Sequence, residues 1–297
     1  MNTEIYFFSG TGNSYSVAAT IAHQLDASLL PVVPYREDES VTSTGDTVGI
    51  VFPIYDFKAP ELVKDFVCKL KTPDSTYFFG VCTYGVTYLN AMKKLEEAFN
   101  SAGKELSGGF AIKAPHSGLG YDRIPAEKQK EMYKLARKKC TSISSYVRSR
   151  KRGTIETSSL RDRVVLLGLL VRLLPGLFPM FKQALFEGWD SLGFYADEKC
   201  NGCRVCERVC PMDNITMGEE KPTWGDNCIN CFACFHWCPR ESIQIANLTG
   251  KMERRHHPEV RLVDLIEQKH RIFTKTCRES PGARSGDESA GLPPALQ

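Results

Sequence analysis

The chain has 297 residues, more than one small domain needs, and its 42% hydrophobic and 25% charged residues are ordinary for a globular protein. This composition excludes collagen-like, coiled-coil and wholly disordered chains, and a net charge of +3 points to no class of partner. Cysteine is the exception, because eight of twelve lie between Cys200 and Cys238. The first residues carry no basic region typical of a secretory signal, so we expect a cytoplasmic protein whose clustered cysteines bind metal.

The first 115 residues alternate short apolar segments with amphipathic helical patterns. We expect helices at 13–25, at 60–70 and up to about residue 99, and strands at 5–8, 29–33, 48–52, 77–82 and 110–112. Almost continuously apolar strands that alternate with helices are typical of a parallel sheet covered on both faces. The sequence therefore predicts an α/β domain with a doubly wound, five-stranded parallel sheet.

A basic stretch with helical character follows at 127–163, with twelve Lys or Arg against four Glu or Asp. It suits a docking surface for an acidic redox partner or, more simply, a solvated helix face. Residues 164–181 are apolar apart from Arg172, and Pro175 interrupts them. We expect a buried or interfacial helix there; peripheral membrane contact is the alternative, and the central Arg172 argues against a membrane span.

Two cysteine blocks share the spacing C-x2-C-x2-C-x3-C-P and repeat after about 28 residues. In each block three thiolates can wrap one cluster, while the fourth, next to proline, reaches the other cluster. The pattern resembles the bacterial two-cluster ferredoxins and predicts two [4Fe–4S] clusters. Their expected ligands are Cys200, Cys203, Cys206 and Cys238 for the first, and Cys228, Cys231, Cys234 and Cys210 for the second. Zinc also binds four thiolates, but a zinc site calls for neither the third cysteine of each block nor the Cys-Pro.

A glycine loop lies between the first expected strand and the first expected helix, with the residues Ser9, Gly10, Thr11, Gly12, Asn13 and Ser14. Its small residues let the backbone close around an anion, and neutral side chains add donors. The loop matches neither the dinucleotide nor the P-loop pattern. It resembles the phosphate loop of flavodoxins, and this resemblance implies a flavodoxin-like domain that binds FMN.

Two further loops follow strands at the same edge of the expected sheet and would cover the flavin ring. The cofactor-binding residues that we expect in them are Pro53, Ile54, Tyr55, Thr83, Tyr84 and Gly85. Each tyrosine would stack on the ring or simply pack in its loop, and a glycine would let the backbone approach the ring edge. Asp56 is most simply a solvated acid.

Three histidines are of interest, although the sequence assigns no catalytic residue. His116 follows the last expected strand, at the open end of the sheet, where it is a candidate proton donor. His256 and His257 adjoin arginines and are more simply surface or interface residues.

The glycine loop, the segment PIYDFKAP, both cysteine blocks and the segment RRHHPEV together resemble the EFR1-type ferredoxin family. In that family a flavodoxin-like domain is fused to a two-cluster ferredoxin, and its members are electron-transfer flavoproteins of anaerobes. We therefore expect the following parts: a flavodoxin-like FMN domain at 1–150, a basic and apolar helical linker at 151–195, a small α+β ferredoxin domain at 196–250, a C-terminal extension at 251–278 and a disordered tail at 279–297.

The function that we expect is electron transfer between two [4Fe–4S] clusters and bound FMN, in an oxidoreductase of anaerobic metabolism. The protein would be a reductase of a small organic acceptor or an electron-transfer partner. The alternatives are a pure carrier between proteins and a membrane-surface adaptor of a larger redox complex. The sequence has no nicotinamide fingerprint, and no motif indicates nucleic-acid binding.

Overall fold

The computed structural model describes residues 2–55, 58–118, 124–159, 164, 193–245 and 253–271. The expectations for Asp56, for the apolar segment beyond Val164 and for the tail at 279–297 lie outside the described residues. Within the described ranges, no helix combines the length and the apolar composition that a membrane crossing requires.

The N-terminal part is built on a parallel sheet with the strand order β2-β1-β4-β6-β7-β8. Its strands are β1 (Thr3–Phe7), β2 (Ser28–Pro31), β4 (Thr47–Pro53), β6 (Tyr77–Tyr84), β7 (Leu106–Lys113) and β8 (Thr154–Ile155). The order of the first five is that of the flavodoxin-like doubly wound fold, which confirms the predicted fold class. The sheet has one strand more than the expected five, because β8 pairs two residues with the edge of β7.

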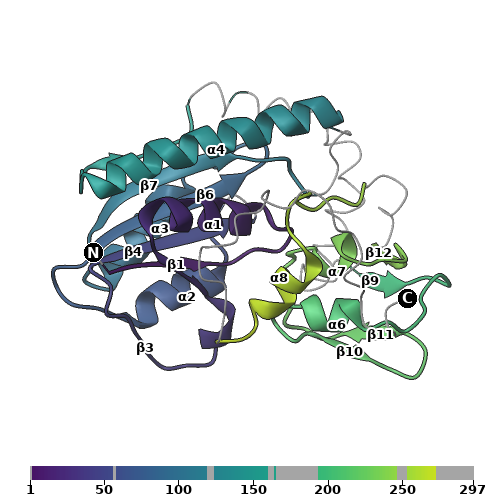
Figure 1. The fold of residues 1–297 in the computed structure, drawn as a ribbon. Helices are drawn as coiled ribbons and strands as arrows, with labels where there is room; N and C mark the ends of the chain where they lie inside the picture. The colour runs from purple at the N-terminus through teal and green to yellow at the C-terminus, as the bar shows by residue number, and fades with distance from the viewer. Residues whose placement is uncertain are drawn as a thin grey trace.

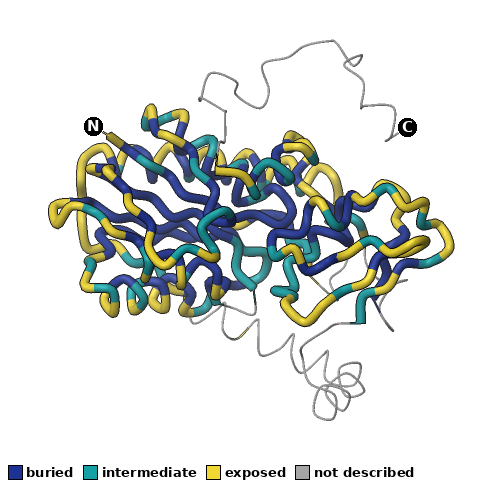
Figure 2. The backbone as a smooth tube through the Cα atoms, turned by 90° about the horizontal axis from the view of Figure 1, so that it is seen from below, coloured by how far each residue is buried: buried dark blue, intermediate teal, exposed yellow. Residues whose placement is uncertain are grey.

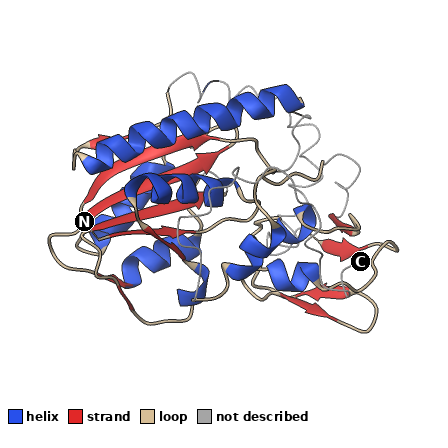
Figure 3. Ribbon diagram, in the orientation of Figure 1, coloured by secondary structure: helices blue, strands red, loops and turns tan. Residues whose placement is uncertain are grey.

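Helices cover both faces of this sheet (Figures 1 and 3). One face carries α1 (Asn13–Leu25) and α4 (Ala126–Arg148), and the other carries α2 (Glu61–Lys69) and α3 (Ala91–Ser101). Strand β1 supplies both cores: Ile5 and Phe7 belong to the first, and Tyr6 to the second. Neighbouring side chains of a strand point to opposite faces, so a continuously apolar strand requires this two-sided cover.

Several local details differ from the expectations. Within the described residues of the basic stretch, the helix α4 ends at Arg148. Pro60 is the N-cap of α2 rather than part of its first turn. A 3-10 turn, η1 (Val33–Tyr35), follows β2, and the two-residue strands β3 (Val41–Thr42) and β5 (Leu70–Lys71) pair outside the main sheet. These short elements lack the length that a periodic pattern needs to be visible.

The second part, residues 193–245, is an internal repeat. The first half contains β9 (Phe194–Ala196), α6 (Val205–Val209) and β10 (Ile215–Met217), and the second half contains β11 (Pro222–Trp224), α7 (Ala233–His236) and β12 (Ile243–Ile245). Antiparallel pairs join β10 to β11 and β9 to β12, so the halves are interleaved. The same left-handed backbone recurs 28 residues apart, at Gly202 and Asn230, Arg204 and Phe232, and Asp213 and Glu241.

Residues 253–271, with the helix α8 (Leu262–Glu267), run between the two parts (Figure 1). The core on the α1 face of the sheet continues across this boundary. It includes Ile21 of α1, Val209 of α6, Trp237 after α7 and Leu265 of α8. Figure 2 shows the buried backbone extending from the sheet into the cysteine-containing part. The two parts therefore share one apolar core.

Candidate cofactor sites

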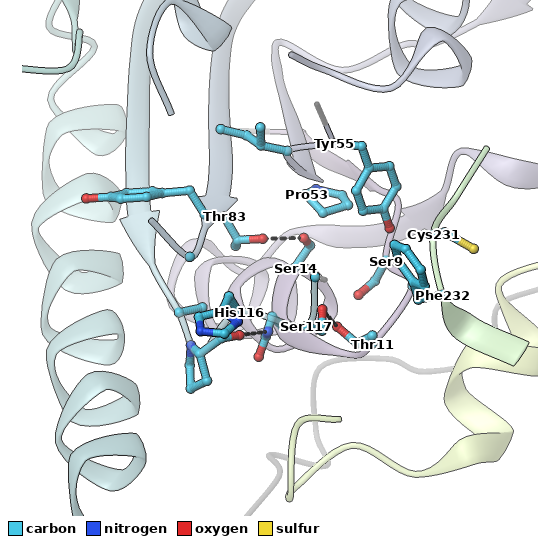
Figure 4. Close-up of a pocket in the computed structure, with 18 of the residues that line it drawn as sticks. Ser9, Thr11, Ser14, Pro53, Tyr55, Thr83, His116, Ser117, Cys231 and Phe232 are labelled. Carbon is cyan, nitrogen blue, oxygen red and sulfur yellow. Dashed lines mark hydrogen bonds between the residues drawn. The ribbon is translucent and has the colours of Figure 1, made fainter. Parts of the chain in front are cut away.

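A cavity of about 590 Å³ lies where the parallel strands end (Figure 4). Loops after β1, β4, β6 and β7 line it, and so does the second cysteine block, through Asn230, Cys231 and Phe232. A cavity of this size and mixed polarity suits a small-molecule cofactor. The carboxyl ends of doubly wound strands are also where such folds bind their ligands.

The cavity brings together all but one of the residues that the sequence predicts to bind a cofactor. Those that line it are Ser9, Gly10, Thr11, Asn13, Ser14, Pro53, Ile54, Tyr55, Thr83, Tyr84 and Gly85. Gly12 does not, because it is the N-cap of α1 and faces His257 and Val260 instead. Its φ of 92° is left-handed, a conformation that favours glycine.

Hydrogen bonds between side chains tie the glycine loop to its neighbours. The hydroxyls of Ser14 and Thr83 lie 2.7 Å apart, and those of Thr11 and Ser117 lie 3.2 Å apart, as the dashed lines in Figure 4 show. The Ser9 hydroxyl accepts a bond from the Gly12 N–H. Among the lining residues that the structure describes, none is Lys or Arg. An anion here would be held by neutral donors and by the N-terminus of α1.

One buried polar atom in the cavity wall marks a place for a ligand. Asn13 donates from Nδ2 to the carbonyl oxygen of Pro115, 2.9 Å away, while its Oδ1 is buried and has no partner among the described residues. An unsatisfied buried acceptor costs free energy, which a hydroxyl group of a bound ligand would recover. The lining residues thus fit a ligand with an anionic group, hydroxyls and an apolar part.

Both candidate ring-stacking tyrosines line the cavity and also pack against other aromatic side chains. The rings of Tyr55 and Phe8 meet edge to face at 6.1 Å, and those of Tyr84 and Tyr88 lie 4.8 Å apart. Burial raises the pKa of Tyr55 well above its usual range, and the neighbouring Cys231 raises it further. Figure 4 shows Tyr55 beside Cys231 and Phe232.

Gly85 makes room for a side chain of the protein itself. A Cβ atom on Gly85 would lie 2.1 Å from the Cβ of His116, so a larger residue would displace the histidine. His116 lines the cavity, as expected of a candidate proton donor, and its carbonyl oxygen accepts a bond from Arg255 at 2.9 Å. The glycine therefore holds a position for His116 that the sequence gave no reason to expect.

The eight cysteines of the two blocks form two groups. Burial, together with charge on nearby Cys203, Cys238 and Cys200, raises the pKa of the Cys206 thiol to about 12. Burial likewise raises the pKa of Cys234, with added effects from Cys231, Cys210 and Cys228. Each group thus takes three cysteines from one block and the fourth from the other. Within the described residues, no three His, Cys, Asp or Glu side chains lie close enough to hold a single metal ion.

Backbone N–H groups donate to the crossing cysteines in the same way in both halves of the repeat. Asn214 donates to Cys210 Sγ at 3.4 Å, and Ser242 donates to Cys238 Sγ at 3.3 Å. Such bonds to cluster ligands are one means by which a protein sets the potential of a cluster.

Two of the three histidines of interest lie at the boundary between the parts. The ring of His256 stacks on Trp237 at 4.1 Å, and the ring of His257 packs on Tyr133 at 4.4 Å. A fourth histidine, His236 of α7, also lies at this boundary, although the sequence did not mark it as a residue of interest. Its Nδ1 accepts a bond from the Arg255 N–H, so its Nε2 carries the proton and donates to the carbonyl oxygen of Ser117, 2.8 Å away.

Comparisons with known proteins give matches to separate parts of the chain. Residues 199–257 match the family model described as a 4Fe-4S dicluster domain, in accordance with the predicted iron–sulfur, ferredoxin-like part. An uncharacterized protein of Methanocaldococcus jannaschii is 34% identical over 58 residues, which is 20% of this chain. The match spans 22% of the length of that relative.

Similar solved structures cover about half of the chain. A flavodoxin, WrbA-like protein from Agrobacterium tumefaciens is 17% identical, with a TM-score of 0.34, over 50% of this chain and 99% of its own. A flavodoxin of Streptococcus pneumoniae TIGR4 is 17% identical, with a TM-score of 0.30, over 48% of this chain and 99% of its own. An FMN-dependent NADH-azoreductase from Bacillus anthracis, solved with FMN, is 13% identical, with a TM-score of 0.32, over 48% of this chain and 100% of its own.

Proposed function

We propose that this protein transfers electrons between FMN, bound in the cavity, and two [4Fe–4S] clusters held by the two cysteine groups. The observation that carries this proposal is the position of Cys231, which lines the same cavity as the glycine loop. A predicted cluster ligand thus forms part of the wall of the predicted flavin site. No other protein is needed between them.

FMN suits this cavity better than a dinucleotide does. The neutral hydroxyls and the start of α1 suit one phosphate group, and the flavodoxin-like strand order favours a site for FMN at the edge between β1 and β4. Tyr55, Tyr84 and Phe232 supply aromatic surface for the ring.

A flavin exchanges one or two electrons and a cluster exchanges one, so the combination connects one-electron with two-electron chemistry. The second cysteine group, through Cys231, adjoins the cavity. Cys200 and Cys203 of the first group are as exposed as Cys228 and Cys231 of the second. The residues beside them differ, because Asn201, Gly202 and Arg204 are exposed, so the first group has the more exposed loop. We infer the order cavity, second group, first group, external partner.

The internal repeat supports this order. In the second block, Ile229 packs against the core of the sheet-containing part and Phe232 lines the cavity. The equivalent residues of the first block, Asn201 and Arg204, are exposed. Exposed Lys199 and Arg208 flank the same loop, so an acidic redox protein is the partner that we propose for it. In contrast, two cations of α4 already form ion pairs within the chain: Lys139 with Glu156 and Arg137 with Glu259.

The test begins with the anaerobically purified full chain and its content of iron, zinc and FMN. The proposal requires about eight iron atoms and about one FMN per chain. Stepwise reduction would then be followed by flavin absorbance and by electron paramagnetic resonance of the reduced clusters. Zinc in place of iron, or no FMN binding after FMN is added, would contradict it.

The same preparation distinguishes a reductase from a pure carrier. Turnover of a small organic acceptor, with a reduced donor and no added protein, would identify a reductase and exclude the carrier. Because His116 lines the cavity, acceptors that gain a proton with their electrons are the first to test. Peripheral membrane contact through 164–181 stays a prediction, to be tested by flotation with liposomes.

A further inference from the structure

Three consecutive backbone carbonyls of the glycine loop accept hydrogen bonds from the second cysteine block and from the segment 253–271. Ser9 O accepts a bond from Gln268 Nε2 at 2.8 Å, Gly10 O from Trp237 Nε1 at 3.0 Å, and Thr11 O from the backbone N–H of His257 at 2.8 Å. None of the three donor residues lines the cavity, whereas all three acceptor residues do. The carbonyls are therefore held on the side of the loop away from the ligand.

The direction of these bonds determines where the N–H groups of the loop point. In a planar trans peptide the C=O and the following N–H point in opposite directions. Fixing the carbonyls of Ser9 and Gly10 away from the cavity thus aims the N–H groups of Gly10 and Thr11 toward it. Neither N–H has a hydrogen-bond partner among the described residues, so both are available to an anion.

Of the three donor residues, Gln268 makes the most hydrogen bonds to the glycine loop. Its side chain is fully buried, and its Oε1 also accepts the Ser9 N–H at 3.2 Å, so that it binds both polar groups of one residue. It is the C-cap of α8, whose start is fixed by a capping box between Arg261 and Asp264 and whose Leu265 is in the shared core. A buried amide that forms two bonds to one backbone segment restricts the conformation of that segment.

We propose that Gln268, Trp237 and the backbone of His257 are positioning groups of the FMN phosphate site, so that the segment 253–271 completes a site that the flavodoxin-like part only begins. This inference rests on the proposed binding of FMN. It assigns a role in flavin binding to Trp237 of the second cysteine block and to the segment 253–271, which lies outside both the flavodoxin-like part and the cysteine blocks. The groups act on the phosphate through the loop rather than by contact with the ligand.

The test compares FMN with riboflavin, which lacks the phosphate, on the full chain with its clusters in place. In Gln268→Met the side chain keeps its length and loses both hydrogen bonds. We expect its dissociation constant for FMN, measured by quenching of flavin fluorescence, to rise by about tenfold or more. Its affinity for riboflavin and its iron content should not change.

Gln244→Met is the matched control, because Gln244 is also buried and hydrogen-bonded but binds Asp197 and Glu241, away from the cavity. A second variant, Trp237→Phe, removes the Nε1 donor to Gly10 while keeping an aromatic ring beside His256, and it should have the same selective effect. Trp237→Phe tests the same inference if Gln268→Met fails to fold. Unchanged FMN affinity, or equal loss for both ligands, would overturn the inference while leaving the proposed function intact. Failure of the unaltered protein to bind FMN would instead refute the proposed function.

Discussion

Gly10 lies directly against the backbone of Cys231, since a Cβ atom on Gly10 would come within 2.7 Å of the Cys231 carbonyl oxygen. The hydroxyl of Tyr55 would be equally close. The glycine loop and the second cysteine block therefore approach each other as closely as their backbones allow. This contact joins the two predicted cofactor sites, and four predictions address it and its surroundings.

The first prediction concerns this contact. Gly10→Ala places a methyl group against a backbone atom that cannot turn aside, so the loop and the block must separate. We expect the free energy of unfolding to fall by about 1–3 kcal/mol, as in other overpacked sites. Electron exchange between clusters and flavin, followed by anaerobic stopped-flow absorbance, should slow. Gly218→Ala in the β10–β11 turn, where the nearest atom is at 3.1 Å, is the control. Equal behaviour of the two variants would argue against the contact.

The second prediction concerns the ligands on either side of the repeat. Cys231 and Cys203 occupy equivalent positions, but only Cys231 lines the cavity. We expect Cys231→Ser to weaken FMN binding by about tenfold, because the loop that walls the cavity loses its metal anchor. Cys203→Ser should leave FMN binding unchanged and lose one cluster by electron paramagnetic resonance.

Removal of all the iron by anaerobic chelation extends this prediction. Iron-free protein should bind FMN as weakly as Cys231→Ser does, and reconstitution with iron and sulfide should restore binding. If the iron-free chain binds FMN as well as the complete protein, the cavity does not depend on the cysteine block.

The third prediction concerns pH. Burial, together with the charges of Arg137 and His256, lowers the pKa of His257 from its usual 6.5 to about 4. Between these values the unfolded chain binds more protons than the folded one, so the free energy of unfolding falls as the pH drops from about 6.5 toward 4. At pH 5 the loss from this residue is about 2 kcal/mol.

Unfolding by urea at pH 7 and pH 5 measures this loss. His257 Nδ1 accepts the Glu259 N–H at 3.2 Å, and Tyr133 covers the ring, so proton uptake disturbs both contacts. His257→Gln should show a smaller difference between the two pH values, whereas His23→Gln, on the exposed side of α1, should behave as the unaltered protein does. If the free energy of unfolding of His257→Gln still differs as much between pH 7 and pH 5, the pH dependence comes from other groups.

The fourth prediction concerns the external partner. Charge reversal of Lys199 and Arg208 to Glu should lower the rate of electron exchange with an acidic redox protein by several-fold and weaken its dependence on salt. Lys134→Glu on α4 carries the same kind of change to the other candidate surface. If only the α4 variant slows exchange, the partner docks on the helix instead of the first cysteine block.

The elements that the sequence predicted are those with a long local signal. The bounds of α1 agree with the expected 13–25, since an amphipathic pattern follows directly on a glycine loop, and each main strand of the first 115 residues contains a continuous apolar segment. The two residues of β8 carry no such signal and are strand only because β7 offers a free edge. The lining residues that the sequence predicted follow apolar strands, whose ends meet at one edge of a parallel sheet, whereas Asn230, Cys231 and Phe232 were not predicted to line the cavity.

The rest of the site depends on contacts distant in sequence. Gln268 lies in an unremarkable helical segment, and nothing near it in the chain indicates that it binds Ser9. His236 follows the pattern of a ferredoxin helix, and its bond to Ser117 requires that the cysteine block already sits on the sheet. The sequence predicted that Gly12 binds the cofactor, but in the structure Gly12 packs against His257 and Val260 of the C-terminal segment. Interfaces of this kind leave no periodic or spacing signal in a single sequence.

The apolar core shared between α1, α6 and α8 makes the two halves poor candidates for modular exchange. A flavodoxin-like half expressed alone would expose the side of α1 that Val209, Trp237 and Leu265 now cover, along with the unbound carbonyls of its glycine loop. A chimaera that joined this half to an unrelated ferredoxin would have the same defect. We therefore expect the ferredoxin-like part and the C-terminal segment to fold together with the flavodoxin-like part as one unit.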